Sequence, residues 1–583
     1  MTASASLPDT LSDAVRRHRS GQLDEAAAAY ARILEAQPLH PDALHLLGVV
    51  RAQTGRPGEA VALIAQAAAL IPASVAYRTN LTKAAHGDAG LVGPALLRAG
   101  DSLFDRGRPD AAAVCYRAAL AHRPDDPVAW GNLAQALRNA GRAAEAVAPM
   151  GRANRLDPGD RQIVAYLAGL HHALGDGAAA EVLLRGALAR APDDAALRLA
   201  LADAVKLRGR PEEAIRLYRG ALALAPGEAG AWFNLGVSLG DLGRQAESAT
   251  PYRRASRLDP SHVDARYNLA HALLATGRYA EGWAAFEARF RRGVDIPDRG
   301  RPWWRGEALE GRRILLYGEQ GHGDVIQFIR YAPLVARAGG RVMVECQPAL
   351  RRLLARVEGV EKVHTLGEAS DFDLICPLMS LPALFGAVPS GAAARVPYLD
   401  GAAAGEDRFA GLWPEGDGVL TVGLVWAGDP HAADARWSRA DRRRSLPLAA
   451  FAPLLDIPGL RLVSLQKGSA AAQAAEPPFA GRMIDAMDRA EDFADTAALV
   501  RRLDLVISVD TAVAHLAGAL AVPVWVLSRF NGCWRWPAGR EDSLWYPTAR
   551  VLHQPRYDDW QPVLDRVAAD LRTLAGERAG NPA

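Results

Sequence analysis

The chain has 583 residues, half of them hydrophobic and 23% charged, with a formal net charge of +2. This length predicts several domains, and the near-neutral charge argues against nucleic acid or an anionic membrane as a bulk partner. Cys115, Cys346, Cys376 and Cys533 lie far apart without a C-x-x-C pair, so neither a disulfide framework nor a zinc site is expected. No signal-peptide pattern and no long apolar run occurs, so we expect a cytoplasmic protein without membrane insertion.

Glycines and prolines recur at a fixed interval in the first half of the chain. Gly21 and Gly55 lie 34 residues apart, and a second series keeps that interval: Gly107, Gly141, Gly175, Gly209, Gly243 and Gly277. Prolines keep the same period: Pro38, Pro72, Pro124, Pro158, Pro192, Pro226 and Pro260. Small residues such as Ala26 stand between each glycine and its proline, followed four residues later by larger ones such as Tyr30. A glycine turn, a small residue where helices approach and a closing proline predict an array of helix pairs.

This pattern resembles the tetratricopeptide repeat, with eight copies in register over residues 9–290 after a flexible N-terminus, residues 1–8. Gly55 and Gly107 are 52 residues apart, 18 more than one repeat, which predicts an insertion near residues 86–97. Arrays of this family stack into a superhelix with a concave binding face. Such an array has no chemistry of its own.

Four repeats carry an asparagine just before the leucine of their first helix: Asn80, Asn132, Asn234 and Asn268. A side-chain amide can pair with both the donor and the acceptor of an extended peptide backbone. Protein O-GlcNAc transferases have a similar ladder in their groove, so the resemblance implies that Asn132, Asn234 and Asn268 contact an acceptor peptide. Tyr166 and Ala200 interrupt the series. Ordinary packing between repeats is the alternative.

The second half has a different architecture, since ten of the thirteen tryptophans lie at or beyond Trp303. Residues 291–310 are polar and contain Pro and Gly, so they are predicted to be a linker that Trp303 and Trp304 pin against a neighbouring domain. Two series of alternating strands and helices follow, over residues 311–405 and 406–583. They predict two Rossmann-like domains facing each other across a cleft. The last helix is expected to cross back and brace the first of them.

One strand–helix–strand unit carries the strongest candidate site. A buried strand predicted over residues 505–509 is followed by Asp510 and Thr511 and then by a helix of small residues, 512–520. His515 lies four residues after Thr511, on the same helix face. Ligands of parallel sheets bind beyond the carboxyl ends of the strands, here beside the positive end of a helix dipole, so an anionic ligand is predicted. The alternative is a capping aspartate and a structural histidine.

The first strand of the second half, residues 312–318, ends in the loop EQGHGD. Its glycines do not form a dinucleotide-binding fingerprint. They do allow the backbone to approach a ligand closely, which makes Gly323 a candidate for donor contact. Asp324 then stands at the start of a helix, where its alternative role is that of a helix cap.

A G-D-V motif after the first strand and D-T-x-x-x-H-L-A after a distal one are similar to glycosyltransferase family 9, the ADP-heptose transferases of lipopolysaccharide assembly. The resemblance covers about residues 311–560. It implies the GT-B fold and a metal-independent, inverting sugar transfer from a nucleotide-diphosphate-sugar, with no cofactor.

The same resemblance implies roles for individual residues. Asp324 corresponds to the proposed general base, and Asp510, Thr511 and His515 correspond to the segment that holds the nucleotide-sugar. The family usually has Gly-Pro after D-T, whereas Ala512 and Val513 stand here. The backbone is therefore expected to approach the diphosphate less closely.

A diphosphate leaving group without a metal needs basic side chains or amide donors where negative charge develops. Three consecutive arginines end at Arg444 and are followed by Ser445, on the same rim as the helix after Asp510, so Arg444 and Ser445 are candidates for the phosphates. Gln466 and Lys467, at the end of the next strand, are candidates for ribose or phosphate. A solvated basic run is the alternative.

Asp371 and Asp373 imitate a metal-binding D-x-D motif but lead into a strand, so no metal is expected. The leading hypothesis is a hexosyl- or heptosyltransferase-like enzyme whose repeat groove recruits a protein acceptor, in an architecture similar to protein O-GlcNAc transferases. The alternative is a protein-interaction scaffold whose transferase-like domain has lost catalysis. Transfer to a glycolipid is less favoured because it would leave the repeats idle. The sugar, the nucleotide and the acceptor stay open.

Overall fold

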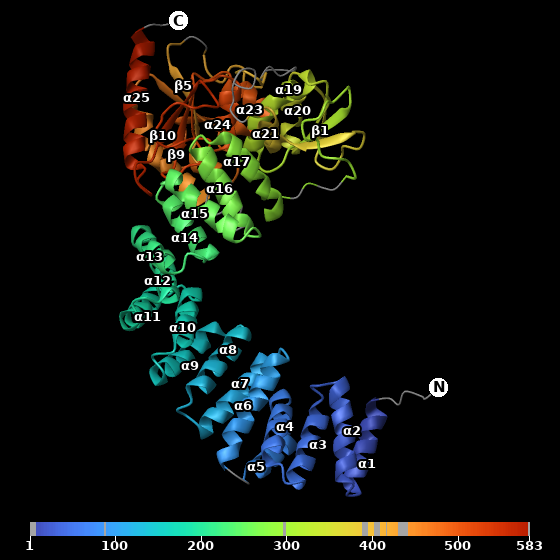
Figure 1. The fold of residues 1–583 in the computed structure, drawn as a ribbon. Helices are drawn as coiled ribbons and strands as arrows, with labels where there is room; N and C mark the ends of the chain where they lie inside the picture. The colour runs from blue at the N-terminus through green and yellow to red at the C-terminus, as the bar shows by residue number, and fades with distance from the viewer. Residues whose placement is uncertain are drawn as a thin grey trace. The chain divides into compact units, whose positions relative to one another are not determined.

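The computed structural model describes residues 7–86, 89–294, 296, 299–386, 395–400, 408–414, 417–428 and 441–580. The chain forms two compact units, Met1–Gly227 and Glu228–Ala583, which are described separately. The first unit is helical, and the second contains both parallel sheets (Figure 1). None of the described helices combines the length and the apolar character that a membrane span requires.

Helix pairs of the predicted period build the first unit. Its helices are α1 (Leu7–Arg19), α2 (Leu23–Ala36), α3 (Pro41–Gln53), α4 (Pro57–Leu70), α5 (Val75–Ala85), α6 (Ala89–Asp105), α7 (Pro109–His122), α8 (Pro127–Asn139), α9 (Ala143–Leu156), α10 (Arg161–Ala173), α11 (Gly177–Arg190), α12 (Ala195–Leu207) and α13 (Pro211–Leu224). The six glycines in its inter-helix turns have φ angles from +71° to +80°, which L side chains rarely adopt. The glycine period therefore marks the turns, as predicted.

The predicted insertion takes the form of an additional helix. Both α5 and α6 follow α4 before the next glycine turn at Gly107, where a regular repeat has one helix. Both also pack on α4. Residues 87–88, between them, lie outside the described part of the chain.

A carboxylate between two neighbouring repeats holds three arginines of the first unit together. Glu181 of α11 is 7% exposed and lies 2.8 Å from Arg185, 2.6 Å from Arg208 and 2.8 Å from Arg210. Burial raises the pKa of Glu181, but the three guanidinium groups outweigh it and lower that pKa to about 2. The ionised form of Glu181 therefore stabilises this joint.

Glu181→Gln should lower the free energy of unfolding by about 1–2 kcal/mol at pH 7, because three arginines lose their shared carboxylate. The folded pKa lies below the unfolded one, so this contribution is complete above about pH 4.5 and is lost as the pH falls toward 2. Urea midpoints of wild type and variant should differ at pH 7 and converge on acidification. Glu212→Gln, an exposed position of α13, is the control. A difference that does not change with pH would contradict this account.

The second unit begins with two more helix pairs and continues into two α/β regions. The pairs are α14 (Ala229–Asp241) with α15 (Gln245–Leu258) and α16 (Val263–Ala275) with α17 (Tyr279–Phe286), followed by the 3₁₀ helix η1 (Glu287–Arg292). The first sheet has the order β3-β2-β1-β4, from β1 (Arg313–Tyr317), β2 (Arg341–Cys346), β3 (Val360–Thr365) and β4 (Leu374–Pro377). The second has the order β10-β9-β8-β5-β6-β7, from β5 (Leu420–Val425), β6 (Leu460–Ser464), β7 (Met483–Asp485), β8 (Leu505–Val509), β9 (Val524–Ser528) and β10 (Ala549–His553).

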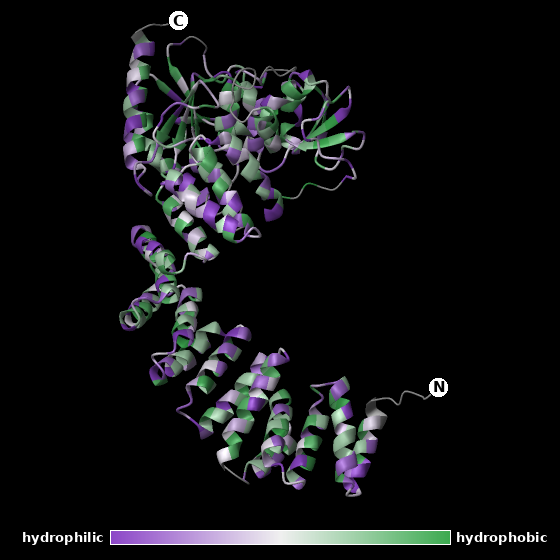
Figure 2. Ribbon diagram, viewed as in Figure 1, coloured by the Kyte–Doolittle hydropathy of each residue, from purple (hydrophilic) through white to green (hydrophobic). Residues whose placement is uncertain are grey.

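All neighbouring strands in both sheets pair in parallel, as the alternating pattern predicts. Val506 of β8 pairs with Gly423 of β5 on one side and with Val524 of β9 on the other. The carboxyl ends of these three strands therefore meet at one edge. Figure 2 shows hydrophobic residues interleaved with hydrophilic ones along the repeat helices.

Short helices connect the strands. They are α18 (His322–Phe328), η2 (Ile329–Tyr331), α19 (Ala332–Arg337), η3 (Pro348–Leu350), α20 (Arg351–Leu354), η4 (Leu378–Ser380), α21 (Leu381–Leu384), η6 (Leu448–Asp456), η7 (Ser469–Ala475), η8 (Met487–Arg489), α23 (Phe493–Val500) and α24 (Ala512–Ala519). The last helix, α25 (Gln561–Gly580), packs on β5 and η6 of the second sheet. The prediction that it crosses back to the first α/β region is therefore wrong, because Val567 and Leu571 complete the core of its own region.

The last repeat and both sheets share one hydrophobic core. Trp283 of α17 is 1% exposed, and its ring centroid lies 5.6 Å from that of Phe328 and 5.1 Å from that of Trp534. In the predicted linker, Trp304 donates its backbone N–H to Ile375 of β4 at 2.9 Å. The compact unit thus begins at Glu228, before the predicted boundary at 290, and the predicted boundary at 405 lies outside the described residues.

Candidate functional site

A cavity of about 1410 Å³ lies within the second unit. Three walls enclose it: the carboxyl ends of β5, β6 and β8, the loop between β1 and α18, and the helices α14 and α16 of the last two repeats. It therefore lies where ligands of parallel sheets bind, as predicted. Eight of the predicted site residues of the α/β regions line it: Gly323, Asp324, Arg444, Gln466, Lys467, Asp510, Thr511 and His515.

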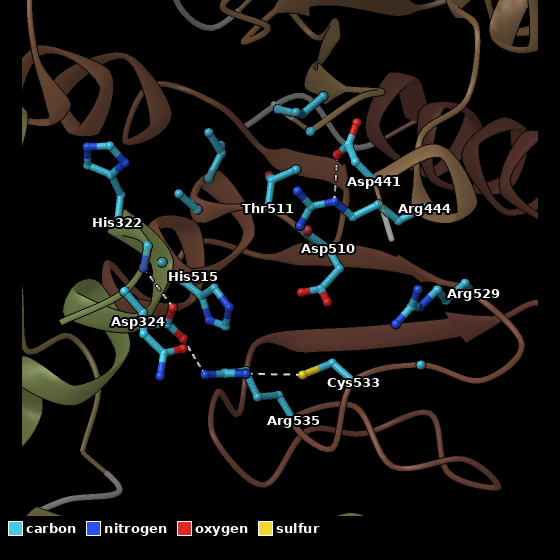
Figure 3. Close-up of a pocket in the computed structure, with 18 of the residues that line it drawn as sticks. His322, Asp324, Asp441, Arg444, Asp510, Thr511, His515, Arg529, Cys533 and Arg535 are labelled. Atoms are coloured by element: carbon cyan, nitrogen blue, oxygen red, sulfur yellow. Dashed lines mark hydrogen bonds and ion pairs between the residues drawn. The ribbon is translucent and has the colours of Figure 1, made fainter. Parts of the chain in front are cut away.

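Asp324 is held by groups of the chain itself. Its Oδ2 accepts the backbone N–H of Gly321 at 3.1 Å, so it caps α18, the role given above as the alternative. Its Oδ1 forms an ion pair with Arg535 (Figure 3). Each oxygen of a carboxylate has two lone pairs, so each keeps one for a further donor.

Gly323 brings α18 and α24 into direct contact. A Cβ atom at this position would lie 2.9 Å from Cδ2 of His515 and 3.3 Å from Cα of Ala512. Only glycine allows this approach without a shift of backbone, so Gly323 sets the spacing of the two helices that carry Asp324 and Thr511. The sequence predicts a close approach of this backbone to a ligand, whereas the close approach in the structure is to α24.

Asp510 and Thr511 form the start of α24. The carboxylate of Asp510 accepts from Nε1 of Trp536 at 2.8 Å. Burial raises the pKa of Asp510, but His515, Trp536 and Arg444 outweigh it and hold that pKa below its ordinary value. The hydroxyl of Thr511 lies 2.9 Å from that of Ser508, and α24 has no side-chain cap at its first turn. The positive end of this helix therefore faces the cavity without a protein anion capping it.

His515 is a buried, neutral imidazole. Its ring stacks on Trp536 at 5.5 Å between centroids, and its Nδ1 lies 3.0 Å from the hydroxyl of Tyr546. Burial, followed by the charge of Arg535, lowers the pKa of His515 to about 3. It can therefore offer hydrogen bonds to a ligand at neutral pH but no positive charge.

The residues predicted to bind phosphate and ribose differ in whether their side chains line the cavity and which partners they already have. Arg444 lines the cavity, donating Nη1 to the carbonyl of Asp510 at 2.7 Å and Nε to Asp441 at 3.0 Å. Ser445 is not among the residues that line the cavity. Its hydroxyl accepts a hydrogen bond from the backbone N–H of Gly428 at 3.0 Å. Its prediction as a phosphate contact is therefore not supported by the geometry.

The other predicted pair is tied to the backbone. The side-chain oxygen of Gln466 accepts from the N–H groups of Trp426 and Ala427 at 3.1 and 2.9 Å, and its nitrogen donates to Ala427 and Lys467 carbonyls. This amide joins the ends of β5 and β6 and has no group left for ribose. The Lys467 ammonium donates to the carbonyl of Ala490 at the cavity wall.

Arg529, immediately after β9, is a cation that the sequence analysis missed. It lines the cavity, is partly buried and points toward the region of Asp510 (Figure 3). Within the described part of the chain, its guanidinium has no hydrogen bond or ion pair. Burial lowers the pKa of Arg529, opposed by the charge of Asp510. Its place beyond the carboxyl end of a strand next to β8 was the available signal.

Arg535 was also missed, although it organises the boundary between the two α/β regions. Besides Asp324, it donates to the side-chain oxygen of Gln327 at 2.5 Å and approaches the sulfur of Cys533 at 3.1 Å. The available signal was the W-R-W sequence at residues 534–536, in a part of the chain rich in tryptophan.

The predicted asparagine series does not come together at the cavity. Asn268 lines it and hydrogen-bonds Tyr252, whereas Asn234 is not among the lining residues. Asn132, in the first unit, donates its amide to Asp101 at 3.2 Å. Asn80 similarly lies 2.9 Å from His45, so these two amides serve packing between repeats.

Comparison with known proteins identifies the helical half. A family model described as tetratricopeptide repeat matches residues 16–75, 97–161, 167–229, 208–262 and 233–293. The helix pairs are tetratricopeptide repeats. Protein FlbA of Caulobacter vibrioides is 27% identical over 332 residues, which cover 50% of this chain and 52% of FlbA. The chain thus spans about half the length of this relative.

Solved structures of other repeat proteins also match. MamA from Desulfovibrio magneticus RS-1 is 21% identical, covers 30% of this chain and 98% of its own, and has a TM-score of 0.28. The tetratricopeptide-repeat protein TTC0263 of Thermus thermophilus is 26% identical, covers 31% of this chain and 99% of its own, and has a TM-score of 0.26.

The predicted D-x-D imitation is engaged elsewhere. Asp371 pairs with the Arg313 side chain, and Asp373 accepts the backbone N–H of Arg313 at 2.8 Å. Over the described ranges, no group of three or more His, Cys, Asp or Glu side chains is arranged to hold a metal ion.

Proposed function

We propose that this protein is a glycosyltransferase that moves a sugar from a nucleotide-diphosphate-sugar to a protein acceptor recruited by its tetratricopeptide repeats. The observation that carries the proposal is that Arg529, Arg444 and the start of α24 line one cavity at the carboxyl edge of the second sheet. The guanidinium of Arg529 forms no hydrogen bond or ion pair with a described residue, and it lines the same cavity as Arg444 and the uncapped start of α24. A diphosphate supplies the negative charge that these groups attract.

The proposed reaction gives each of these groups a role. An acceptor hydroxyl oxygen forms a bond to the anomeric carbon of the donor, and the bond from that carbon to the phosphate oxygen breaks. The electron pair leaves with the nucleoside diphosphate, whose growing charge Arg529, Arg444 and the α24 amides stabilise. The hydroxyl proton goes to Asp324, and the configuration at the anomeric carbon inverts. We propose a metal-independent mechanism on the GT-B fold, with the two parallel sheets on opposite sides of the cavity.

The protein acceptor is inferred from the repeats. Tetratricopeptide arrays bind protein partners, and α14 and α16 of the last two repeats form one wall of the cavity. A polypeptide bound along α14 and α16 would thus lie beside the proposed general base, Asp324.

A protein-interaction scaffold is the second candidate, and one observation favours it. Both oxygens of Asp324 already accept a donor from the chain, and the polar side chains of Ser445 and Gln466 are engaged with the backbone. A transferase-like domain that has lost catalysis could keep these contacts for stability. Nucleotide binding separates the two candidates.

Arg529→Gln should weaken the binding of nucleoside diphosphates about 10- to 150-fold, because a charge-assisted contact with phosphate is lost. Calorimetric titration with ADP, UDP and GDP, with and without magnesium, is the measurement. Arg443→Gln is the matched control, since Arg443 stacks on Tyr557 and does not line the cavity. Turnover of nucleotide-sugars should survive EDTA.

Three outcomes would count against the proposal. Binding of no nucleotide by the wild type would favour the scaffold. Equal losses in the Arg529 and Arg443 variants would show only a general effect of charge. Binding that requires magnesium would overturn the metal-independent mechanism.

A further inference from the structure

A second polar group without a partner lies on the opposite wall of the cavity. His271 of α16 lines the cavity three residues after Asn268, on the same helix face. Its Nε2 atom is buried and has no hydrogen-bond partner among the described residues. A buried polar atom left unpaired costs about 1–3 kcal/mol, and a ligand that donates to Nε2 from the cavity would recover this free energy.

Aromatic neighbours fix the orientation of this imidazole. Its ring centroid lies 4.5 Å from that of Tyr267 and 5.7 Å from that of Phe286. Burial, followed by the charges of Arg535 and Arg292, lowers the pKa of His271 to about 3. The ring is therefore neutral at physiological pH, with one nitrogen able to accept a hydrogen bond.

The surroundings of His271 place it near the proposed reaction centre. The charge of Arg535, the partner of Asp324, acts on this ring, and Asp324 and Arg535 line the same cavity. Asn268, one helical turn earlier, is already hydrogen-bonded to Tyr252. His271 thus has an unused ring nitrogen on the wall that the last repeat contributes.

We propose that Nε2 of His271 accepts a hydrogen bond from a main-chain N–H of the acceptor polypeptide. This inference rests on the proposed transferase function and names a binding residue for its acceptor. The attacking hydroxyl gives its proton to Asp324, so the donor to His271 must be a different group. A main-chain N–H is the donor that nearly every residue of a polypeptide carries, and the wall belongs to a tetratricopeptide repeat, a module that typically binds protein partners. His271 then positions the acceptor beside Asp324 without taking part in proton transfer.

Two substitutions in the full-length protein test this assignment. His271→Phe keeps a ring of similar shape and removes the acceptor atom, whereas His271→Gln keeps a side-chain oxygen that can accept. The assay measures transfer from a nucleotide-sugar that the wild type uses to a pool of synthetic peptides containing Ser and Thr. In His271→Phe, KM for the peptides should rise about five- to hundredfold with kcat little changed, because a contact made equally in ground and transition states is lost. His271→Gln should recover part of this loss.

Binding of UDP, ADP and GDP provides the control. Their affinities should be the same in wild type and both variants, which would show that the region around the second sheet is folded. Unchanged peptide KM in His271→Phe would overturn the inference and leave the transferase assignment intact. Equal defects in both variants would show a packing role and also overturn it. A wild type that transfers to no peptide, yet binds nucleotide, would overturn the peptide acceptor as well. No nucleotide binding at all would remove the proposed function itself.

Discussion

Asp324→Asn should reduce sugar transfer by about 10²–10⁴-fold, because the amide keeps the shape of the side chain and cannot take the acceptor proton. Release of nucleoside diphosphate from the donor, with acceptor present, is the measurement. The amide oxygen can still accept the Gly321 N–H that caps α18. Nucleotide affinity should therefore change little, since the cations that hold the phosphates belong to the second sheet.

The ion pair with Arg535 requires a separate control for this experiment. Asp324→Asn leaves the buried Arg535 guanidinium with Gln327 and Cys533 as its neighbours. Gln327→Leu perturbs the same arginine and keeps the carboxylate, so it should retain most of the activity. A rate above about a tenth of wild type in Asp324→Asn would mean that another group is the base.

Arg289→Met should destabilise the second unit by about 3–5 kcal/mol, because it leaves the buried carboxylate of Glu319 without its counter-charge. Arg289 is 0% exposed and Glu319 is 3% exposed, with Nη2 and Oε1 2.8 Å apart. The urea midpoint of the full-length protein should fall accordingly. Arg292→Met is the matched control in the same 3₁₀ helix: its ion pair with Asp264 is exposed, so it should cost about 1 kcal/mol or less.

The pH dependence of the Arg289 variant follows from the state of Glu319. Burial raises the pKa of Glu319 already in the wild type, against the opposing charge of Arg289. Without that arginine the folded state binds the Glu319 proton still more tightly than the unfolded state, so stability falls as the pH rises above about 4.5. The defect should shrink on acidification and in the double variant Arg289→Met/Glu319→Gln. A defect that is equal at all pH values would point to lost packing.

Periodic features of the sequence predict the fold well. The glycine interval marks the turn within each helix pair, because only glycine readily adopts a positive φ there. The strand over residues 505–509 has the predicted bounds because it is buried on both faces. The loop after β9 has no such period, so Arg529 could be found only by its place at the end of a strand and Arg535 only by the tryptophans beside it. The position of Gln466 at the end of β6 was predicted from the sequence. The backbone groups that take up all hydrogen bonds of its amide become visible only in the folded structure. Likewise, the burial of Trp283 against Phe328 depends on packing between distant segments.

The buried contacts of Trp283 and Arg289 have a consequence for how this protein can change its partners. They make the last two repeats a fixed part of the second unit, because removing them would expose the aromatic neighbours of Trp283 and leave Glu319 without its arginine. Repeats before Gly227 belong to a separate compact unit. Gain, loss or exchange of repeats there can alter which protein partners bind without changing the residues that line the cavity. Partner binding and the cavity can thus evolve, or be engineered, at different places along one chain.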